Sequence, residues 1–299
     1  MPLSLDFAFE GFRIIREKPK LILFWGLVLL IGGGLTQVLF VAIAGADYER
    51  VQALSPTMDQ AAVLSLMTRA FPNLALAIGA ILPIELVMTA ILSCAVFRAA
   101  WGDKDDRFGY LRFGADEWRQ VAVQVLLMLV GFGLFVAIAT AAVAIGSAFG
   151  STAQGAAISV ALLVFGLVFV AFALLRLSLC AAQSFDRKTV NVFGSWTLTA
   201  KHGWTLLGGY VVAAVMAVLV YLLCGGIFSA LVAIIDGGQL SVAAARPDMT
   251  SLQAYLKPLT IAGMVYSYVF IAPLITALRL GAQAAAYRTL AGQTPDLGV

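Results

Sequence analysis

Charged residues are scarce in this sequence: they make up 12% of its 299 residues, whereas a typical soluble domain carries about 25%. So few charges cannot cover a water-soluble surface, and 62% of the residues are hydrophobic. The apolar residues come in long blocks, and a block of about 20 spans a bilayer core. Lipid is therefore the expected solvent. The net charge of +3 is small and no dense run of Lys and Arg occurs, which argues against a nucleic-acid partner.

Residues and motifs that carry chemistry are also few. The single histidine, His202, has no second His or Cys at ligand spacing, so we expect no metal site. Cys94, Cys180 and Cys224 each lie inside an apolar block, where packing explains them better than redox chemistry. Neither a Gly-x-Ser-x-Gly elbow nor a Walker-type loop occurs, so we expect no hydrolase, nucleotide-driven mechanism or cofactor. The charges of 103–119 have mixed signs and predict a solvated loop.

Six apolar blocks predict an all-α, polytopic membrane protein that forms one domain over 1–299. The expected transmembrane helices lie at about 21–45, 74–97, 121–149, 158–183, 205–235 and 261–285. Their lengths permit tilt without fixing it. The first twenty residues mix charged and apolar side chains, and the block that follows is too long for a signal peptide. We therefore expect the first block to stay as a membrane anchor.

The distribution of Lys and Arg predicts the orientation, because cytoplasmic loops carry the excess of these residues. Of the 19 Lys and Arg residues, thirteen fall on the side that holds both termini. Four fall on the other side, and two lie inside the spans. Both termini are therefore expected on the cytoplasmic side.

A short amphipathic segment precedes each odd-numbered span, at about 4–19, 107–120 and 190–204. In the first segment the charges recur at helical spacing opposite an apolar stripe, which predicts a helix in the headgroup layer. The later segments carry the expected interfacial anchors Trp118, Trp196 and Trp204. The even-numbered spans all end in an aromatic and a basic residue. These likenesses predict three copies of one unit: interfacial helix, span, outer connection and span.

Two of the outer connections are long and contain helix-start signals. Ser55-Pro56 places a capping residue before a proline at the first helical position, and predicts a short helix on the outer surface. Thr250-Ser251 precedes a second short helical pattern. The connection at 150–157 is expected to be a tight turn.

Glu85, Arg176 and Arg279 are the candidate intramembrane polar site. Glu85 lies 12 residues after Asn73, about 18 Å into its span at about 1.5 Å per residue, near the middle of a core about 30 Å thick. The two arginines lie at a similar depth. A carboxylate there is costly unless it is paired or wetted, so we hypothesise that Glu85 pairs with Arg176 or Arg279. Such a pair could be a structural contact, or part of a solute or proton pathway.

Pro83 and Pro273 lie within spans, where a missing backbone donor predicts a kink and a freed carbonyl. Glycine pairs and triplets are expected to let helices approach closely. They occur at 32–34, 131–133, 208–209 and 225–226, with Gly146 and Gly150 four residues apart.

The stretch FGSWTLTAKHGW at 193–204, followed by Leu206 and Leu207, resembles a recurring segment of one group of bacterial six-span membrane proteins. The group includes the membrane domain fused to some glycerophosphodiester phosphodiesterases, also named the glycerophosphoryl diester phosphodiesterase membrane domain, and related proteins of uncharacterised function. The lead-in from Leu175 through Arg176 to Phe185 is similar too. The resemblance implies a six-span protein of the bacterial inner membrane. It implies no phosphodiesterase activity, because that family's catalytic domain is a separate soluble barrel.

These features favour a non-enzymatic membrane protein that associates with lipids or serves as a platform for partners. The alternative is a transporter or channel for a small solute or lipid, with Glu85, Arg176 and Arg279 near the midplane. A membrane-embedded enzyme would need a polar cluster at one interface, which the sequence does not indicate. Membrane lipids are the expected partners, and protein partners or a homo-oligomer stay open.

Overall fold

The computed structural model describes residues 4–54, 60–104, 106–150, 152–235 and 247–292, and every element in these residues is helical. Six stretches of helix there are long and apolar enough to cross a membrane. The elements are η1 (Leu5–Phe9), α1 (Glu10–Glu17), α2 (Lys20–Gln52), α3 (Gln60–Trp101), η2 (Arg107–Tyr110), α4 (Ala115–Ala148), α5 (Ala153–Leu177), α6 (Cys180–Arg187), α7 (Gly194–Leu198), α8 (Gly203–Ile235), α9 (Leu252–Tyr255), α10 (Pro258–Tyr266), η4 (Ser267–Ile271) and α11 (Ala272–Leu290).

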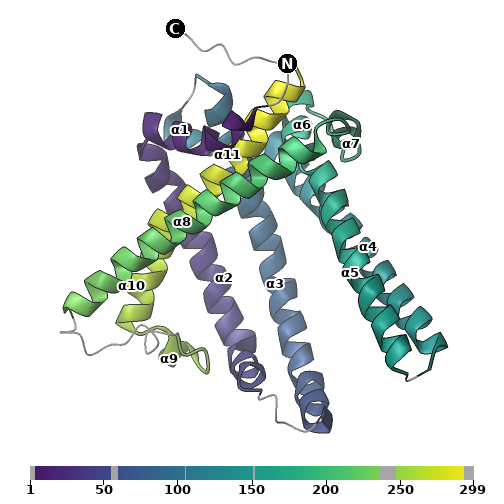
Figure 1. Cartoon of the computed structure of the whole chain (residues 1–299). Helices are drawn as coiled ribbons and strands as arrows, with labels where there is room; N and C mark the ends of the chain where they lie inside the picture. The colour runs from purple at the N-terminus through teal and green to yellow at the C-terminus, as the bar shows by residue number, and fades with distance from the viewer. Residues whose placement is uncertain (1–3, 55–59, 105, 151, 236–246, 293–299) are drawn as a thin grey trace.

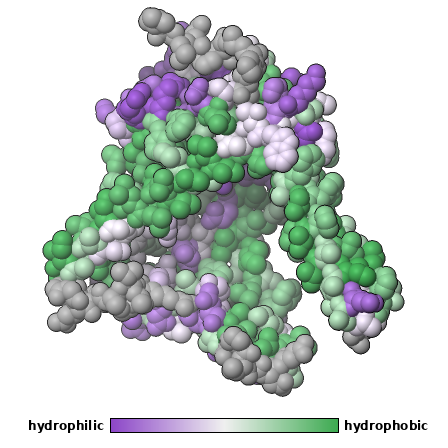
Figure 2. Space-filling view, in the orientation of Figure 1, coloured by the Kyte–Doolittle hydropathy of each residue, from purple (hydrophilic) through white to green (hydrophobic). Residues whose placement is uncertain are grey.

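The long helices converge at one end of the molecule and spread apart toward the other (Figure 1). We call the end that holds α1, α6 and α7 the apex, and the other end the distal end. Helix α2 packs along α3 and α4 packs along α5, while α8 crosses α11 near the apex. The space-filling view shows an open hollow between the α4–α5 pair and the other helices (Figure 2). Apolar side chains cover most of the spread helices.

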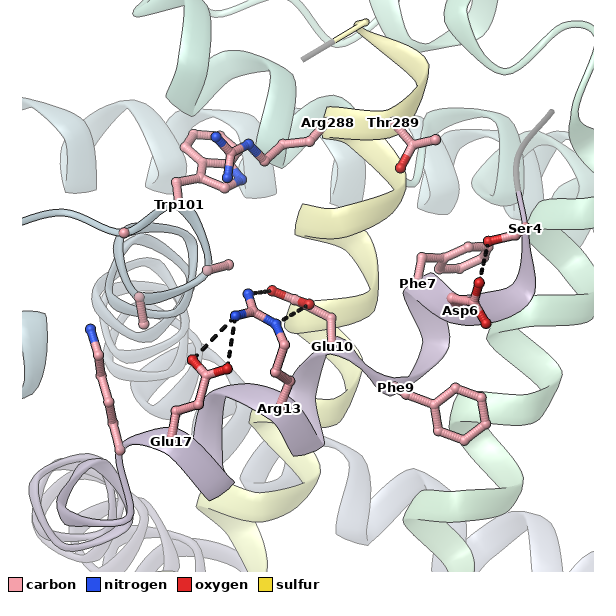
Figure 3. Close-up of a pocket in the computed structure, with 14 residues that line it drawn as sticks. Ser4, Asp6, Phe7, Phe9, Glu10, Arg13, Glu17, Trp101, Arg288 and Thr289 are labelled. Atoms are coloured by element: carbon pink, nitrogen blue, oxygen red, sulfur yellow. Dashed lines mark hydrogen bonds and ion pairs between the residues drawn. The ribbon is translucent and has the colours of Figure 1, made fainter. Parts of the chain in front are cut away.

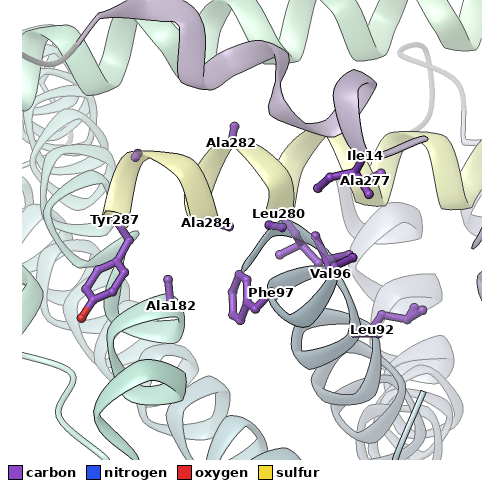
Figure 4. Packing of buried hydrophobic residues seen from close by; sticks show 14 of the residues in the cluster. Ile14, Leu92, Val96, Phe97, Ala182, Ala277, Leu280, Ala282, Ala284 and Tyr287 are labelled. Atoms are coloured by element: carbon purple, nitrogen blue, oxygen red, sulfur yellow. The ribbon is translucent and has the colours of Figure 1, made fainter. Parts of the chain in front are cut away.

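The main hydrophobic core lies in the apex. Its centre is an aromatic cluster in which the Trp101 ring contacts Phe97, Phe185 and Tyr287, with centroid distances of 5.8, 5.2 and 6.1 Å. The last three residues are the aromatic residues at the ends of the even-numbered spans. Figure 4 shows Phe97 of α3 and Tyr287 of α11 beside Ala182 of α6. The apex therefore joins elements from the whole length of the chain.

The N-terminal segment packs across α11 and α8 as part of this core. Phe7, Ala8 and Ile14 are buried, and a Cβ on Gly281 of α11 would lie 2.8 Å from the Gly11 backbone nitrogen. Such a close approach requires glycine on both sides. The residues of the expected interfacial helix are helical as η1 and α1, and they contribute a buried face to the protein interior. Their position in the headgroup layer stays a prediction.

Glycine also allows α2 to approach its neighbours closely, as the sequence predicts. A Cβ on Gly32 would overlap the Met88 side chain of α3, and one on Gly33 would lie 2.3 Å from the Tyr268 ring of η4. In contrast, no atom of the described residues lies within 4 Å of a Cβ added at Gly133, Gly225 or Gly226. These three glycines bring no helices together in this structure.

The segments around the spans differ from the expected repeat. Helix α3 runs without a break from Gln60 through Pro72 and Pro83, so no separate surface helix lies between 60 and the span, and Ser55-Pro56 lies outside the described residues. Water at the membrane surface can satisfy the carbonyl that Pro72 frees, which lets the helix continue. The second predicted interfacial segment, 107–120, is continuous with α4 from Ala115 onward. In the third, 190–204, the five-residue α7 is the only helix before α8 begins at Gly203.

The short helix predicted after Thr250-Ser251 is present as α9. Ser251 caps the short helix α9, and its hydroxyl oxygen accepts a hydrogen bond from the Ala254 backbone nitrogen at 3.2 Å. The connection between α4 and α5 is short, with Thr152 capping α5 by accepting from Gly155 N at 3.1 Å.

Candidate functional site

Glu85 is half-buried on α3 and faces α2. The Thr36 hydroxyl lies 3.1 Å from Glu85 Oε1 and 3.0 Å from the Gly33 carbonyl oxygen, and it can donate to either acceptor. The Tyr268 ring of η4 packs against Gly33, in the same turn of α2 as Thr36. Glu85 therefore lies in a small polar cluster between α2, α3 and η4.

The π-helical turn η4 supports this cluster and ends just before Pro273. Pro273 has no backbone N–H for the carbonyl of Val269, four residues earlier, and a wide turn accommodates the defect. A Cβ on Gly26 of α2 would lie 2.5 Å from that carbonyl oxygen, so α2 approaches η4 closely here. Pro83 is exposed, and α3 stays helical through it.

Arg176 lies at the apex end of α5, where its guanidinium packs on aromatic rings. The Arg176 Cζ is 5.3 Å from the Phe172 ring centroid and 5.5 Å from that of Trp196 on α7, within the range of a cation–π interaction. Its Nε and Nη1 are buried and have no hydrogen-bond partner in the described parts of the chain. The Arg176 carbonyl oxygen accepts from Ser195 and Thr199 at 2.8 and 3.1 Å. Arg176 thereby holds α7 against α5.

Arg279 projects from α11 into a cavity of about 350 Å³ between α11, α8 and the junction of α5 with α6. We call it the Arg279 cavity. Its other lining residues are mostly small or apolar, with Gln283, Tyr210 and Ser178 as the polar members. Tyr210 Oη and Ser178 Oγ are 3.0 Å apart and share a hydrogen bond. Arg279 is exposed, and no described residue forms an ion pair with it.

The three candidate residues thus occupy three separate environments, and within the described ranges no ion pair joins Glu85 to Arg176 or Arg279. The apex aromatic cluster gives a common reference for depth. Glu85 lies 12 residues before Phe97, about 18 Å along α3, whereas Arg279 lies eight residues before Tyr287, about 12 Å along α11. Glu85 is deeper and faces α2, while Arg279 faces α8. The sequence indicated a similar depth for these residues, but it did not indicate which neighbouring helix each side chain faces.

The expected interfacial anchors lie near the apex with exposed rings. Trp118, Trp196 and Trp204 are 57%, 37% and 87% exposed. They lie at the start of α4, in α7 and at the start of α8. Exposure of this degree fits rings that contact headgroups, and their role as anchors stays a prediction.

Sequence reasoning missed a buried ion pair in the apex. Arg98 Nη2 lies 2.7 Å from Glu117 Oε1, with side chains 7% and 1% exposed. Arg98 also donates to the Tyr110 carbonyl oxygen at 3.2 Å. The interpretation of 103–119 as a solvated loop is therefore wrong for Glu117. The sequence does contain a sign that Glu117 belongs to a helix start, because Gly114 precedes it by three residues, the spacing of a capping box. In the structure Glu117 Oε2 accepts from the Gly114 nitrogen at 2.8 Å and caps α4.

The apex also contains a mixed-charge cavity of about 710 Å³ that the sequence did not indicate (Figure 3). Arg13 lies on one side with Glu10 and Glu17, and Trp101 and Arg288 lie on the other. Arg13 Nη1 is 3.1 Å from Glu17 Oε1, and hydrogen bonding to Glu10 raises the pKa of Arg13 above its ordinary value. These two carboxylates are held by one permanently charged guanidinium, which leaves neither well placed as a general base.

No group of three or more His, Cys, Asp or Glu side chains that could hold a metal occurs within the residues the structure describes. Comparison with protein-family models, with curated proteins and with solved structures finds no match for this chain. The resemblance of 193–207 to the six-span bacterial family therefore stays a prediction.

Proposed function

We propose that this protein is a non-enzymatic integral membrane protein of the bacterial inner membrane that associates with membrane lipid. In this proposal the apex faces the cytoplasm and carries both termini. The chain is built from three units of interfacial segment and paired spans. The predicted excess of Lys and Arg on that side supports the orientation.

The spread of the helices carries the proposal. The six spanning helices pack mainly at the apex, and their distal halves leave an open hollow (Figure 2). These halves carry exposed apolar side chains, and Val143, Val160 and Leu223 are each more than half exposed. Water would leave this surface unfavourably hydrated. Lipid chains are the component of a bilayer that fits it.

Lipid retention tests the proposal. The protein would be extracted into native lipid particles, transferred to mild detergent and examined by mass spectrometry for lipids and proteins that stay bound. We expect a defined set of lipids to persist through repeated detergent exchange. A chain that emerges free of lipid, or that stays monodisperse in buffer without detergent, contradicts the proposal. A stoichiometric protein in the same sample would support the platform role.

A transport function is the second candidate, favoured by the cluster of Glu85, Thr36 and Tyr268 beside the π-turn η4. Polar groups at such depth often line ion or solute pathways. Replacing Glu85 with Gln keeps the shape and removes the charge. A transporter should lose flux in reconstituted vesicles while the variant still folds, whereas a structural contact should change stability without a flux to lose.

A further inference from the structure

Helix α8 carries two cavities on the same face. The Arg279 cavity contacts Tyr210, Ala213, Ala214 and Ala217, and a second cavity of about 690 Å³ contacts Phe228, Leu231, Val232 and Ile235. Each residue of the second set follows its counterpart by 18 positions, which is five turns of about 3.6 residues. The two cavities therefore lie along one line on α8, and both face the chain segment 258–290 that pairs with α8.

The two cavities differ in chemistry. The Arg279 cavity holds a guanidinium with donors from Gln283 and Tyr210 nearby. The second cavity is lined by apolar side chains from α8, α10 and η4, with Tyr266 as the polar exception. The Tyr266 hydroxyl donates to the Cys224 carbonyl oxygen at 3.0 Å, so it is already satisfied. One end of this line suits an anion, and the other suits a hydrocarbon chain.

The spacing between the cavities suits one lipid molecule. Ala217 and Phe228 are 11 residues apart, about 16 Å along α8 at about 1.5 Å per residue. That is close to half of a hydrocarbon core about 30 Å thick. An acyl chain that begins beside Arg279 can therefore reach the second cavity.

Charge selects among the possible occupants. No described carboxylate pairs with Arg279, and an uncompensated cation within a span is costly. A phosphate diester supplies the missing charge and accepts bidentate hydrogen bonds from a guanidinium. A neutral lipid would leave Arg279 unpaired, and free phosphate would leave the apolar cavity empty.

We propose that the face of α8 between these two cavities binds one anionic phospholipid, with its phosphate against Arg279 and an acyl chain running toward Phe228. Ala213, Ala214 and Ala217 leave room for the headgroup because their side chains are small. The inference rests on the proposed lipid association and adds the class of lipid and its site. The headgroup is held below the usual headgroup plane, since Tyr210 lies six residues, about 9 Å, inside the exposed Trp204.

The test compares two lipids with identical acyl chains, anionic phosphatidylglycerol and uncharged diacylglycerol, which has no phosphate. Delipidated protein would be titrated with each lipid, and separately with inorganic phosphate, and bound molecules counted by native mass spectrometry. We expect one phosphatidylglycerol to bind about tenfold or more tightly than diacylglycerol, the difference that one charge-assisted hydrogen bond makes. Inorganic phosphate alone should bind far more weakly, because it gains nothing from the apolar cavity.

Two arginine variants separate charge from structure. Arg279→Gln should abolish the preference for the anionic lipid, and Arg279→Lys should retain most of it. Arg176→Gln is the matched control, because it removes an equal charge from a spanning helix where aromatic rings already occupy the guanidinium. It should keep the preference.

A steric variant tests the site without a change of charge. Ala214→Phe places a ring in the cavity from an exposed position and should weaken binding of both lipids. Val215→Phe, the adjacent exposed position that does not line the cavity, should leave binding unchanged.

Three results would overturn this inference. They are a preference for the anionic lipid that survives Arg279→Gln, equal binding of both lipids by the wild type, and inorganic phosphate binding as tightly as the lipid. In each case lipid retention in the native extract would leave the proposed function standing. If the protein binds no lipid at all, both this inference and the proposed function are contradicted.

Discussion

Replacing Glu117 with Gln removes one of the two charges that meet in the buried apex. Arg98 would then keep the Tyr110 carbonyl oxygen at 3.2 Å and the more distant Asp116 at 3.5 Å, but lose its partner at 2.7 Å. Removing one member of a buried pair costs about 3–5 kcal/mol because the remaining charge stays desolvated. Gln can still accept from the Gly114 nitrogen, so the α4 cap survives and the lower part of that range applies.

Glu117→Ala should cost more, because it also removes the cap, which is worth about 0.5–2 kcal/mol. The double replacement Arg98→Met with Glu117→Leu should recover much of the loss, since two apolar side chains leave no unpaired charge. Arg119→Gln is the control. Arg119 pairs with Asp116 at 2.7 Å in a partly exposed i,i+3 contact, a type that contributes about 0–1 kcal/mol.

The assay is thermal unfolding of each variant in one detergent, with the folded fraction checked by size-exclusion chromatography. We expect the unfolding temperature to fall in the order control, Glu117→Gln, Glu117→Ala, with the double variant above both single Glu117 variants. The reasoning is refuted if Glu117→Gln unfolds at the same temperature as Arg119→Gln, because the pair would then contribute no more than a surface contact.

Three further changes test the packing. Gly281→Ala should lower stability by about 1–3 kcal/mol, since its Cβ would meet the backbone of α1 at 2.8 Å, whereas Gly225→Ala, with open space around it, should be neutral or stabilising in the same unfolding assay. Thr36→Val keeps the shape but removes the donor to Glu85, and should cost about 1–3 kcal/mol in the same assay. Trp25→Phe removes a buried N–H that donates to the Gly109 carbonyl oxygen at 2.8 Å, and should lower the unfolding temperature by more than Trp204→Phe, where the ring is 87% exposed.

The sequence predicted the elements whose signal is local. Long apolar runs located the six spanning helices, and the Ser251 cap located α9, because hydropathy and capping act over a few residues. The start of α3 was different, since a surface helix after Ser55 and the continuous helix from Gln60 have the same local pattern. The two possibilities differ only in whether the helix breaks before the span, and the structure shows one unbroken helix from Gln60 to Trp101.

The features that sequence reasoning missed depend on distant contacts. Arg98 and Glu117 lie in different helices, and Glu117 was assigned to a solvated loop because its neighbours in sequence are charged. The separation of Glu85 from Arg279 depends on which helix each faces, which depth along the chain does not specify. The spread of the distal helices likewise follows from packing at the apex rather than from any one span.

The spread of the spanning helices in lipid is the central claim, and a distance between spin labels tests it most directly. After Cys94, Cys180 and Cys224 are replaced, labels would be placed at Ala75 on α3 and Ser147 on α4, with Ser147 and Ala156 on the packed α4–α5 pair as the control. In nanodiscs the control pair should be close, while the first pair should lie well beyond the roughly 8–10 Å between axes of packed helices. Equally short distances for both pairs would mean that the distal helices form a closed bundle with no room for lipid, and would contradict the account.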